Sequence, residues 1–277
     1  MSRSSITDWE RETRWREEAR FFDSVAARHS QRIEAIDPLV LARYGPPSPR
    51  RRFSLEYRFR LLGSLQNRDV LDTGCGDGTN SILLAKLGAR VTGVDISPAS
   101  IELARRRASI NALEGSTQFI CSPLETADFP PNSFDVIWCD AVLHHLISDL
   151  DSLLTRFVKW ARPGGLVLLA EPVNLNRLLR RIRFLVPVKT NATPDERPLE
   201  RPELAIIQRY FPEWHFRHFL LFARLDRFLF LNRNYEHSPR FRRVLSDALA
   251  IVDYGLLSLP GARNLGGTAV IAGRVKK

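Results

Sequence analysis

Residues 70–80 read VLDTGCGDGTN, and this stretch decides the fold. Three glycines stand at alternate positions, Gly74, Gly76 and Gly78, and the acid Asp72 precedes them. Apolar residues before the glycines are typical of a short buried strand, and those after Gly78 are typical of a helix. A strand, a glycine loop and a helix in succession form a nucleotide-binding arrangement, because glycine lets the backbone turn tightly and approach a ligand without an intervening Cβ.

The rest of the chain around this loop alternates between short apolar segments and longer segments of helical periodicity. The apolar segments, predicted as strands, are 69–72, 90–95, 117–121, 134–139 and 165–170. The helices predicted between them are 78–87, 98–112 and 150–160. Apolar strands separated by helices predict a parallel sheet that is covered on both faces.

The two ends of the chain are expected to extend this core. Helices are predicted over residues 7–43 and 53–65, and we expect residues 1–66 to form an N-terminal helical cap. After the fifth strand, an insertion over about 173–212 is predicted to act as a lid or substrate-binding segment. Later elements are predicted to be a helix over 199–210, a strand within 214–225, a helix over 240–257 and a final antiparallel strand. The expected fold class is α/β: a Rossmann-like, seven-stranded, mostly parallel sheet with helices on both faces, in a core of residues 67–277.

Composition places the chain among ordinary globular proteins. Of its 277 residues 44% are hydrophobic and 26% charged, and no apolar run approaches the length of a membrane span. The N-terminus has no apolar signal-peptide core. Cys75, Cys121 and Cys139 lie in apolar segments. We therefore expect buried, reduced cysteines in a cytoplasmic protein, with no disulfide framework and no metal-ligand spacing.

Positive charge is concentrated in one part of the chain. Residues 173–243 contain 15 Lys plus Arg and 7 Asp plus Glu, a net of +8 out of the formal +10. Arginines alternate there with large apolar residues, as in LLRRIRFLVP (178–187) and FRHFLLFARLDRFLFL (216–231). Such a mixture suits a pocket lid or peripheral contact with an anionic membrane, and equally an amphipathic packing face with solvated arginines.

Two classes of ligand compete for the glycine loop. A dinucleotide would place its pyrophosphate at the helix N-terminus, with glycines spaced G-x-G-x-x-G. The spacing here is G-x-G-x-G, and Asp72 at the mouth of the loop would repel pyrophosphate but attract an ammonium group. Asp95, which ends the second strand, can accept both hydroxyls of a ribose. S-adenosylmethionine carries a ribose and an α-ammonium and no phosphate, so its charges fit this loop.

The motifs resemble those of a known family. VLDTGCGDGTN resembles the first motif of class I S-adenosylmethionine-dependent methyltransferases, and VTGVDIS (91–97) resembles the second. SPLETADFPPNSFDVIWCDAVLHHL (122–146) resembles the third and fourth motifs of the small-molecule branch, which includes the ubiquinone- and menaquinone-pathway type. FFDSVAARHS (21–30) weakly resembles a segment that covers the cofactor in that branch, where a tyrosine is usual at the position of His29.

The resemblance implies S-adenosylmethionine as the cofactor and a role for each matching residue. Asp72 would receive the methionyl ammonium, Asp95 the ribose hydroxyls, and the backbone at Leu124 the adenine edge. Pro123 stands where many relatives have an aspartate, which leaves side-chain recognition of the adenine amino group open. The predicted cofactor-binding residues are Asp72, Gly74, Gly76, Asp95, Ile96, Leu124, Glu125 and Asp140.

Candidate catalytic residues follow the fourth and fifth strands, in CDAVLHHL and AEPVN. His144 and His145 are suited to general-base work near neutral pH, and Glu171 could orient a hydroxyl or take a proton. The resemblance also implies a structural alternative, in which the histidine pair packs the loop against the cofactor pocket. A base is needed only if the acceptor is a hydroxyl, an ammonium or a carbon acid. No metal site is predicted.

The predicted function is methyl transfer from S-adenosylmethionine to a small, hydrophobic or lipid-linked metabolite. Nucleic acid is not expected as the substrate, because CDAVLHH lacks the Asn/Asp-Pro-Pro-aromatic run of enzymes that methylate base amines in DNA. The basic segment keeps an RNA methyltransferase open as an alternative. A dinucleotide oxidoreductase and a noncatalytic cofactor-binding protein also remain as alternatives.

Overall fold

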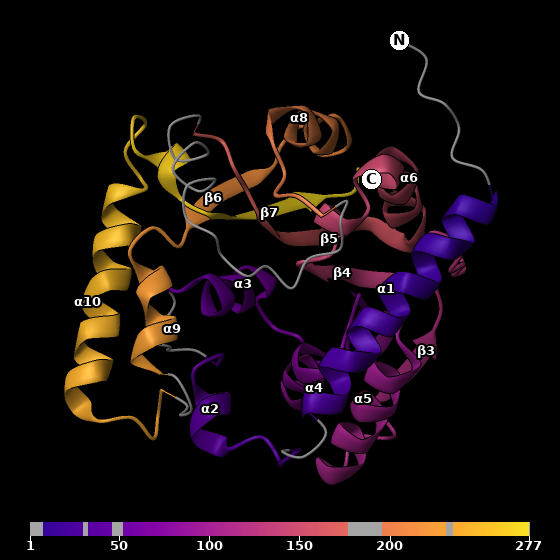
Figure 1. Ribbon diagram of the computed structural model, residues 1–277, viewed down its shortest axis with the longest axis horizontal. Helices are drawn as coiled ribbons and strands as arrows, with labels where there is room; N and C mark the ends of the chain where they lie inside the picture. Colours follow the sequence, from indigo (N-terminus) through magenta and orange to yellow (C-terminus); the bar gives the residue numbers. More distant parts are fainter. Residues whose placement is uncertain (1–7, 30–32, 46–51, 177–195, 231–234, 277) are drawn as a thin grey trace.

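A seven-stranded sheet runs through the middle of the molecule (Figure 1). The computed structural model describes residues 8–29, 33–45, 52–176, 196–230 and 235–276. The strand order is β3-β2-β1-β4-β5-β7-β6. The strands are β1 (Asp69–Thr73), β2 (Arg90–Asp95), β3 (Thr117–Cys121), β4 (Phe134–Asp140), β5 (Ala161–Pro172), β6 (His215–Phe219) and β7 (Thr268–Arg274).

The pairing of the strands confirms the predicted fold class. β1 pairs in parallel with β2 and β4, and the parallel pairs β2–β3 and β4–β5 extend the sheet outward. β7, the last strand in the chain, is antiparallel to both of its neighbours, β5 and β6. The predicted closing strand therefore inserts between two earlier strands and leaves β6 at the edge.

Helices cover both faces of the sheet and precede it (Figure 1). The helices before the sheet are α1 (Asp8–His29), α2 (Pro38–Ala42) and α3 (Ser54–Leu62). Those that follow are α4 (Thr79–Lys86), α5 (Pro98–Ile110), α6 (Leu150–Trp160), α8 (Arg201–Tyr210), α9 (Asp226–Leu229) and α10 (Arg240–Leu256). Short 3-10 turns are η1 (Leu143–His145), η2 (Ile147–Asp149), η3 (Ala223–Leu225) and η4 (Arg263–Leu265).

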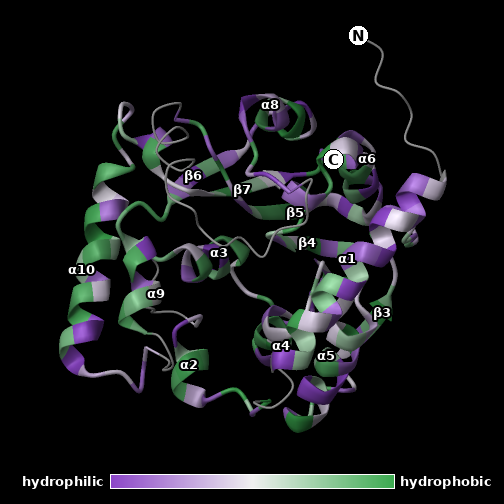
Figure 2. Ribbon diagram, viewed as in Figure 1, coloured by the Kyte–Doolittle hydropathy of each residue, from purple (hydrophilic) through white to green (hydrophobic). Residues whose placement is uncertain are grey.

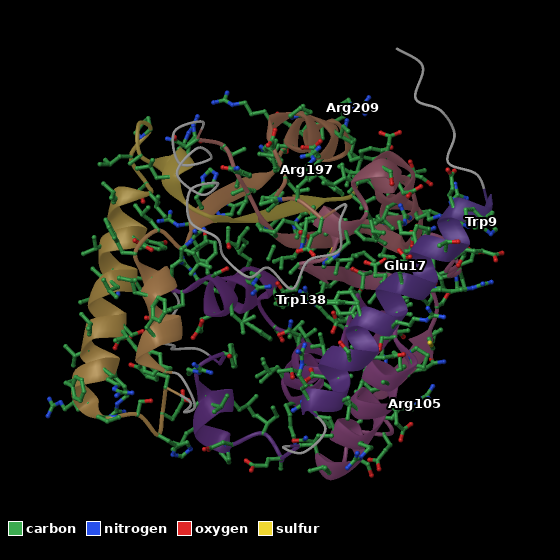
Figure 3. All side chains as sticks on the ribbon, in the orientation of Figure 1. Trp9, Glu17, Arg105, Trp138, Arg197 and Arg209 are labelled. Atoms are coloured by element: carbon green, nitrogen blue, oxygen red, sulfur yellow. The ribbon has the colours of Figure 1, made fainter. Side chains whose placement is uncertain are left out.

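β4 shows how the two layers are built, since successive side chains of a strand point to opposite faces. Val136 and Trp138 pack with α3 and α4, whereas Ile137 and Cys139 pack with α6 and α8. All four are fully buried, which requires an apolar residue at every position. Trp138 lies in the middle of the molecule (Figure 3), with the Arg58 guanidinium 5.0 Å from its ring centroid.

The single helix predicted over residues 7–43 is wrong. α1 ends at His29, and a separate short helix, α2, begins at Pro38. Asp37 is extended and caps α2 by accepting a hydrogen bond from the Leu39 amide at 2.8 Å. Proline at the first helical position is compatible with a helix start but not with a helix that runs through, because it lacks the N–H donor and clashes with the preceding turn.

The cysteines are free, but the expectation that all three are buried is wrong. Cys75 and Cys139 are buried, and burial raises the pKa of both thiols well above the usual value. Cys121 is exposed. It ends β3, which is an edge strand and is therefore covered less completely.

The predicted insertion after β5 is described only in part. Val173 and Leu199 form an isolated parallel bridge, and α8 follows. The basic cluster at positions 180, 181 and 183 lies outside the described residues, so the lid and the division into 1–66 and 67–277 stay predictions. Among the described residues, no helix is both long and apolar enough to cross a membrane.

Substitution of two loop glycines separates backbone strain from crowding. Gly78 has φ +78° and a Cβ there would lie 2.8 Å from the Ala104 Cβ, whereas Gly76 has φ +53° and nothing within 4 Å. We expect Gly76→Ala to cost about 1–2 kcal/mol of unfolding free energy from the left-handed backbone. Gly78→Ala should lose about 1–3 kcal/mol more from crowding. Urea denaturation measures both, and equal losses would contradict this packing.

Candidate functional site

The glycine loop lies at the carboxyl end of β1, beside the end of β2. The Cys75 amide donates to the Val94 carbonyl at 3.0 Å, which holds the loop against β2. A Cβ on Gly74 would collide with the Val142 side chain, so the segment after β4 packs directly on this backbone. Gly76 faces open space instead. The loop is therefore fixed on one side and bare on the other.

Asp95, the last residue of β2, fastens the loop. Its Oδ2 accepts a hydrogen bond from the Gly76 amide at 2.8 Å, and its Oδ1 accepts one from the Ser97 amide at 2.9 Å. Burial raises the pKa of this carboxyl, although the backbone hydrogen bonds oppose the rise. A carboxylate oxygen has two acceptor positions, so each oxygen can accept a further hydrogen bond from a ligand hydroxyl.

Asp72 is a buried acid beneath the loop, with 1% of its surface exposed. The Ser81 hydroxyl donates a hydrogen bond to it. Burial, reinforced by the charges of Asp140 and Asp95, raises its pKa to about 7. A cation placed nearby would stabilise the ionised carboxylate, because an opposite charge favours the charged form.

A hollow opens beside the bare face of the loop. Six of the predicted cofactor-binding residues line it: Gly74, Gly76, Asp95, Ile96, Leu124 and Glu125. Its other lining residues are Glu18, Phe22, Val94, Ser122, Ala141, Val142, His145 and Leu146. Asp72 and Asp140, the other two predicted residues, are not part of this lining, and their predicted roles remain untested.

The contacts of Asp140 are structural ones. Its Oδ2 lies 2.7 Å from the Arg58 Nη1 and accepts a hydrogen bond from the Asn80 side chain at 2.8 Å. Arg58 is a buried cation, and a buried cation without a partner is strongly destabilising. Asp140 therefore compensates Arg58 and ties α3 to the start of α4.

α1 closes one side of the hollow. Glu125, on the loop after β3, accepts hydrogen bonds from the Arg14 guanidinium and from the Trp15 indole, the latter at 2.8 Å. Farther along α1, Asp23 accepts a hydrogen bond from the Ser97 hydroxyl at 2.6 Å. These bonds run from α1 to the segments that follow β2 and β3. The N-terminal helix is therefore fastened over the carboxyl ends of these strands.

Glu171, fully buried in β5, organises the loop after β4. Its Oε1 accepts from the amides of Val142 at 3.0 Å and Leu143 at 2.8 Å, and its Oε2 lies 2.9 Å from the His144 Nδ1. The His144 Nε2 lies 3.2 Å from Glu196. Burial alone would lower the pKa of His144, but hydrogen bonds and the charges of the two glutamates raise it to about 9. His144 is therefore a cation near neutral pH and has no lone pair for a substrate proton.

His145, the other predicted histidine, lines the hollow. Burial and the neighbouring charge of His144 lower its pKa to about 4. Its ring packs edge-on against Phe22, with centroids 5.6 Å apart, and its Nδ1 lies 3.4 Å from Glu18. His145 is thus a neutral imidazole that faces the hollow.

Glu18 is the residue that the sequence analysis missed. It lies on α1, lines the hollow and is 8% exposed. Burial raises its pKa to about 7; the charges of Glu125, Asp95 and Glu196 reinforce the rise, and Arg14 opposes it. The sequence contains a signal for it, because Glu18 falls on the same helical face as the apolar residues Trp15 and Phe22. An acid on an apolar face is either paired or functional.

The fold brings together a group of possible metal ligands that the sequence does not show, and the expectation of no metal site stays a prediction. Donor atoms of His144, His145 and Glu196 lie within 4.8 Å of one another. Position 196 is far from the histidines in the sequence, so spacing along the chain could not show the cluster. Both ring nitrogens of His144 already face carboxylates, and this ion pairing accounts for the arrangement without a metal.

Comparison with known proteins shows what part of the chain is similar to. The family described as "Methyltransferase domain" matches residues 71–169, which run from β1 into β5. This segment is therefore similar to a methyltransferase domain. The resemblance inferred from the motifs is confirmed, and the hollow lies within this domain and under α1.

Similar proteins share the domain but differ in their acceptors. The mitochondrial ubiquinone biosynthesis O-methyltransferase of Schizosaccharomyces pombe is 39% identical over 141 residues, which cover 48% of this chain and 51% of that one. Phosphoethanolamine N-methyltransferase 1 of Arabidopsis thaliana is 40% identical over 104 residues, or 37% of this chain and 20% of that one. This chain thus spans about half or less of these relatives.

A solved structure extends the likeness of fold to almost the whole chain. The geranyl diphosphate C-methyltransferase of Streptomyces coelicolor A3(2) superposes with a TM-score of 0.57 over 95% of this chain and 98% of that one. At 15% identity this shows a common fold and nothing about the substrate.

Substitution of Asp95 tests its proposed place in the cofactor site. We expect Asp95→Ala to weaken S-adenosylhomocysteine binding at least about tenfold, since each hydrogen bond to a charged group contributes about 1.5–3 kcal/mol. Isothermal calorimetry measures the affinity. Asp77→Asn is a matched control in the same loop, because Asp77 pairs with Arg107 and does not line the hollow. Unchanged affinity for Asp95→Ala would remove this residue from the site.

Proposed function

We propose that the protein transfers the methyl group of S-adenosylmethionine to a hydroxyl on a small, hydrophobic or lipid-linked acceptor. One observation carries the proposal: a single hollow joins the bare glycine loop and Asp95 to Glu18 and His145. Cofactor-binding and proton-accepting groups therefore face the same space, as methyl transfer to a hydroxyl requires.

The residues around the loop fit the chemical groups of the cofactor. Asp95 offers two carboxylate oxygens to ribose hydroxyls, and Ile96 offers an apolar surface to adenine. Buried Asp72 would be ionised by an adjacent α-ammonium, which supports its assignment to the methionyl end. When bound, S-adenosylmethionine supplies a methyl group already activated by the positive sulfur. The protein's part is to align the acceptor and exclude water.

The opposite wall suits an apolar acceptor that carries one acidic proton. Phe22, Val142 and Leu146 supply apolar surface, and α1 covers it. Glu18 has a pKa near neutrality and His145 is neutral, so this pair can take a proton from an acceptor hydroxyl. Glu171 and His144 contact the loop rather than the hollow, and we assign them to positioning His145.

The names of the similar proteins include O-, N- and C-methyl transfer, so similarity alone does not choose the acceptor atom. A base of near-neutral pKa favours a hydroxyl, which must lose its proton. A lipid-linked ring hydroxyl, like that named for the ubiquinone O-methyltransferase, is the acceptor we propose. It would place the protein in the cytoplasm at a membrane surface.

A direct assay tests this function. The protein is incubated with methyl-labelled S-adenosylmethionine and, in separate reactions, a prenylated catechol, phosphoethanolamine or total RNA. We expect label only in the catechol. Label in RNA would favour the RNA methyltransferase, and S-adenosylhomocysteine binding without transfer to any fraction of a cell extract would favour a noncatalytic protein. Thermal stabilisation by NAD(P) but not by S-adenosylhomocysteine would favour an oxidoreductase.

The pKa of Glu18 predicts the pH dependence of the reaction. Only the ionised carboxylate can take a proton, and a raised pKa means that this form is lost as pH falls through about 7. We expect kcat/KM to fall roughly tenfold between pH 8 and pH 6. Glu18→Gln should lower kcat about 100-fold or more and abolish this dependence.

The matched control for this variant is Glu17→Gln on the same helix. Glu17 is exposed (Figure 3), so its substitution should leave the rate and the pH profile unchanged. Calorimetry should show equal S-adenosylhomocysteine affinity for both variants at pH 8. A Glu18→Gln enzyme that retains the parent rate would exclude Glu18 as the proton acceptor.

A further inference from the structure

α10 presents an apolar face to solvent. Its exposed large apolar residues, with exposed fractions of 45–67%, are Phe241, Val244, Leu245, Ile251 and Val252. Its buried residues are Ser246, Ala250 and Asp253, which are small or polar. The usual amphipathic arrangement is therefore inverted, since a surface helix normally turns its apolar side inward. The hydropathy colours show long stretches of α10 as strongly hydrophobic (Figure 2).

The apolar residues form one continuous stripe. At about 100° per residue, positions 241, 244, 245, 248, 251, 252 and 255 fall within an arc of about 120°. The buried positions 246, 250 and 253 fall on the opposite side of the helix. Ala248 and Gly255 fill the stripe between the larger residues without introducing a charge.

Hydrogen bonds fix this orientation. The Asp253 carboxylate accepts from three backbone amides, those of Leu221, Phe222 and Ala223, at 2.8–3.0 Å. The Ser246 hydroxyl donates to Asp226 at 2.9 Å. Rotation of α10 to bury its stripe would break these bonds and leave the carboxylate of Asp253 without hydrogen-bond donors, which is strongly unfavourable. The outward apolar face is thus held in place by the rest of the structure.

The elements beside α10 carry exposed apolar side chains of their own. η3 and α9 contact α10 and lie beside it (Figure 1). Phe222, Leu225 and Phe228 are exposed there, and the exposed Leu259 follows the end of α10. Single exposed apolar residues are ordinary, but the stripe on α10 is continuous along the helix, and a continuous stripe marks an interaction surface.

The charge at one end of the stripe indicates an anionic partner. Arg240 is exposed in the first turn of α10, which contains no acid, and its position lies about 20° beyond one edge of the stripe. Arg242 and Arg243 turn toward the protein instead, where Arg242 donates to the Leu229 carbonyl at 2.9 Å and Arg243 lies over the Tyr235 ring. A cation is unfavourable at this end of a helix because the helix dipole is positive there, so a phosphate group would interact favourably with Arg240 and with the helix N-terminus. Apolar residues beside a phosphate-binding arginine match the acyl and headgroup layers of a bilayer.

We propose that the outward face of α10 docks on an anionic lipid bilayer. The apolar stripe enters the acyl boundary, and Arg240 contacts phosphates. This surface uses none of the residues that line the hollow. The inference therefore stands or falls independently of the proposed methyl transfer.

Vesicle binding tests the docking surface. Sedimentation with phosphatidylcholine vesicles, with and without phosphatidylglycerol, gives the partition coefficient of the full chain. We expect binding to the phosphatidylglycerol vesicles that weakens with added salt. The double variant Leu245→Gln/Ile251→Gln should lower the partition coefficient at least about tenfold. Arg240→Gln should lower it less and reduce the salt dependence.

The matched control is Leu39→Gln/Ile110→Gln, which removes two apolar side chains exposed elsewhere, by 61% and 47%. It should bind vesicles as the parent does, and all variants should keep the parent circular dichroism and S-adenosylhomocysteine affinity. Absence of vesicle binding by the parent, or equal losses in the two double variants, would overturn the proposal. So would a solution dimer, seen by sedimentation velocity, that Leu245→Gln/Ile251→Gln dissociates, because the stripe would then bind a second copy.

Discussion

The bonds of Asp95 to the backbone amides of Gly76 and Ser97 shape the part of the hollow that we propose for the cofactor. The glycine loop belongs to the β1 connection and Ser97 to the β2 connection, and one carboxylate accepts an amide from each. Parallel pairing of β1 and β2 brings these connections to the same edge of the sheet. A buried carboxylate is stable there only because donors surround it. The same bonds leave acceptor positions directed at the hollow, so one residue both builds the loop and offers oxygens to a ligand.

A second chain of interactions sets the chemistry at the other end of the hollow. Glu171 is satisfied by backbone amides of the loop after β4 and by His144. The resulting imidazolium lowers the pKa of His145, which remains neutral beside Glu18. Burial and nearby acids raise the pKa of Glu18 in turn. The charged pair of His144 and Glu171 lies outside the hollow, and Glu18 and His145 remain inside it as the two proton acceptors that we propose.

Much of this architecture could be predicted from the sequence, because its signals are local. The strands at 90–95 and 117–121 were bounded correctly by their apolar runs, and the loop glycines and Asp95 lie in short motifs. The break between α1 and α2 was missed because helical periodicity on both sides concealed Asp37 and Pro38. Glu18 and Glu196 were missed for a different reason. Each acquires its environment from segments that are distant in the sequence, and no pattern along the chain encodes that proximity.

This difference explains why similarity identifies the domain more readily than the acceptor. The groups that we assign to the cofactor lie between 72 and 125, inside the segment that the family matches. Glu18, on α1, and Glu196, after β5, lie outside that segment. The proposed acceptor wall therefore combines Glu18 and Phe22 of α1, outside the matched segment, with Val142, His145 and Leu146 inside it. α10 shows the same division. Its inward face is constrained by the hydrogen bonds of Asp253, whereas its outward face makes no such bonds within the described part of the chain and can be shaped by the bilayer that we propose as its partner. We therefore expect acceptor specificity to depend on the elements that surround the carboxyl ends of the strands, and on α1 above all.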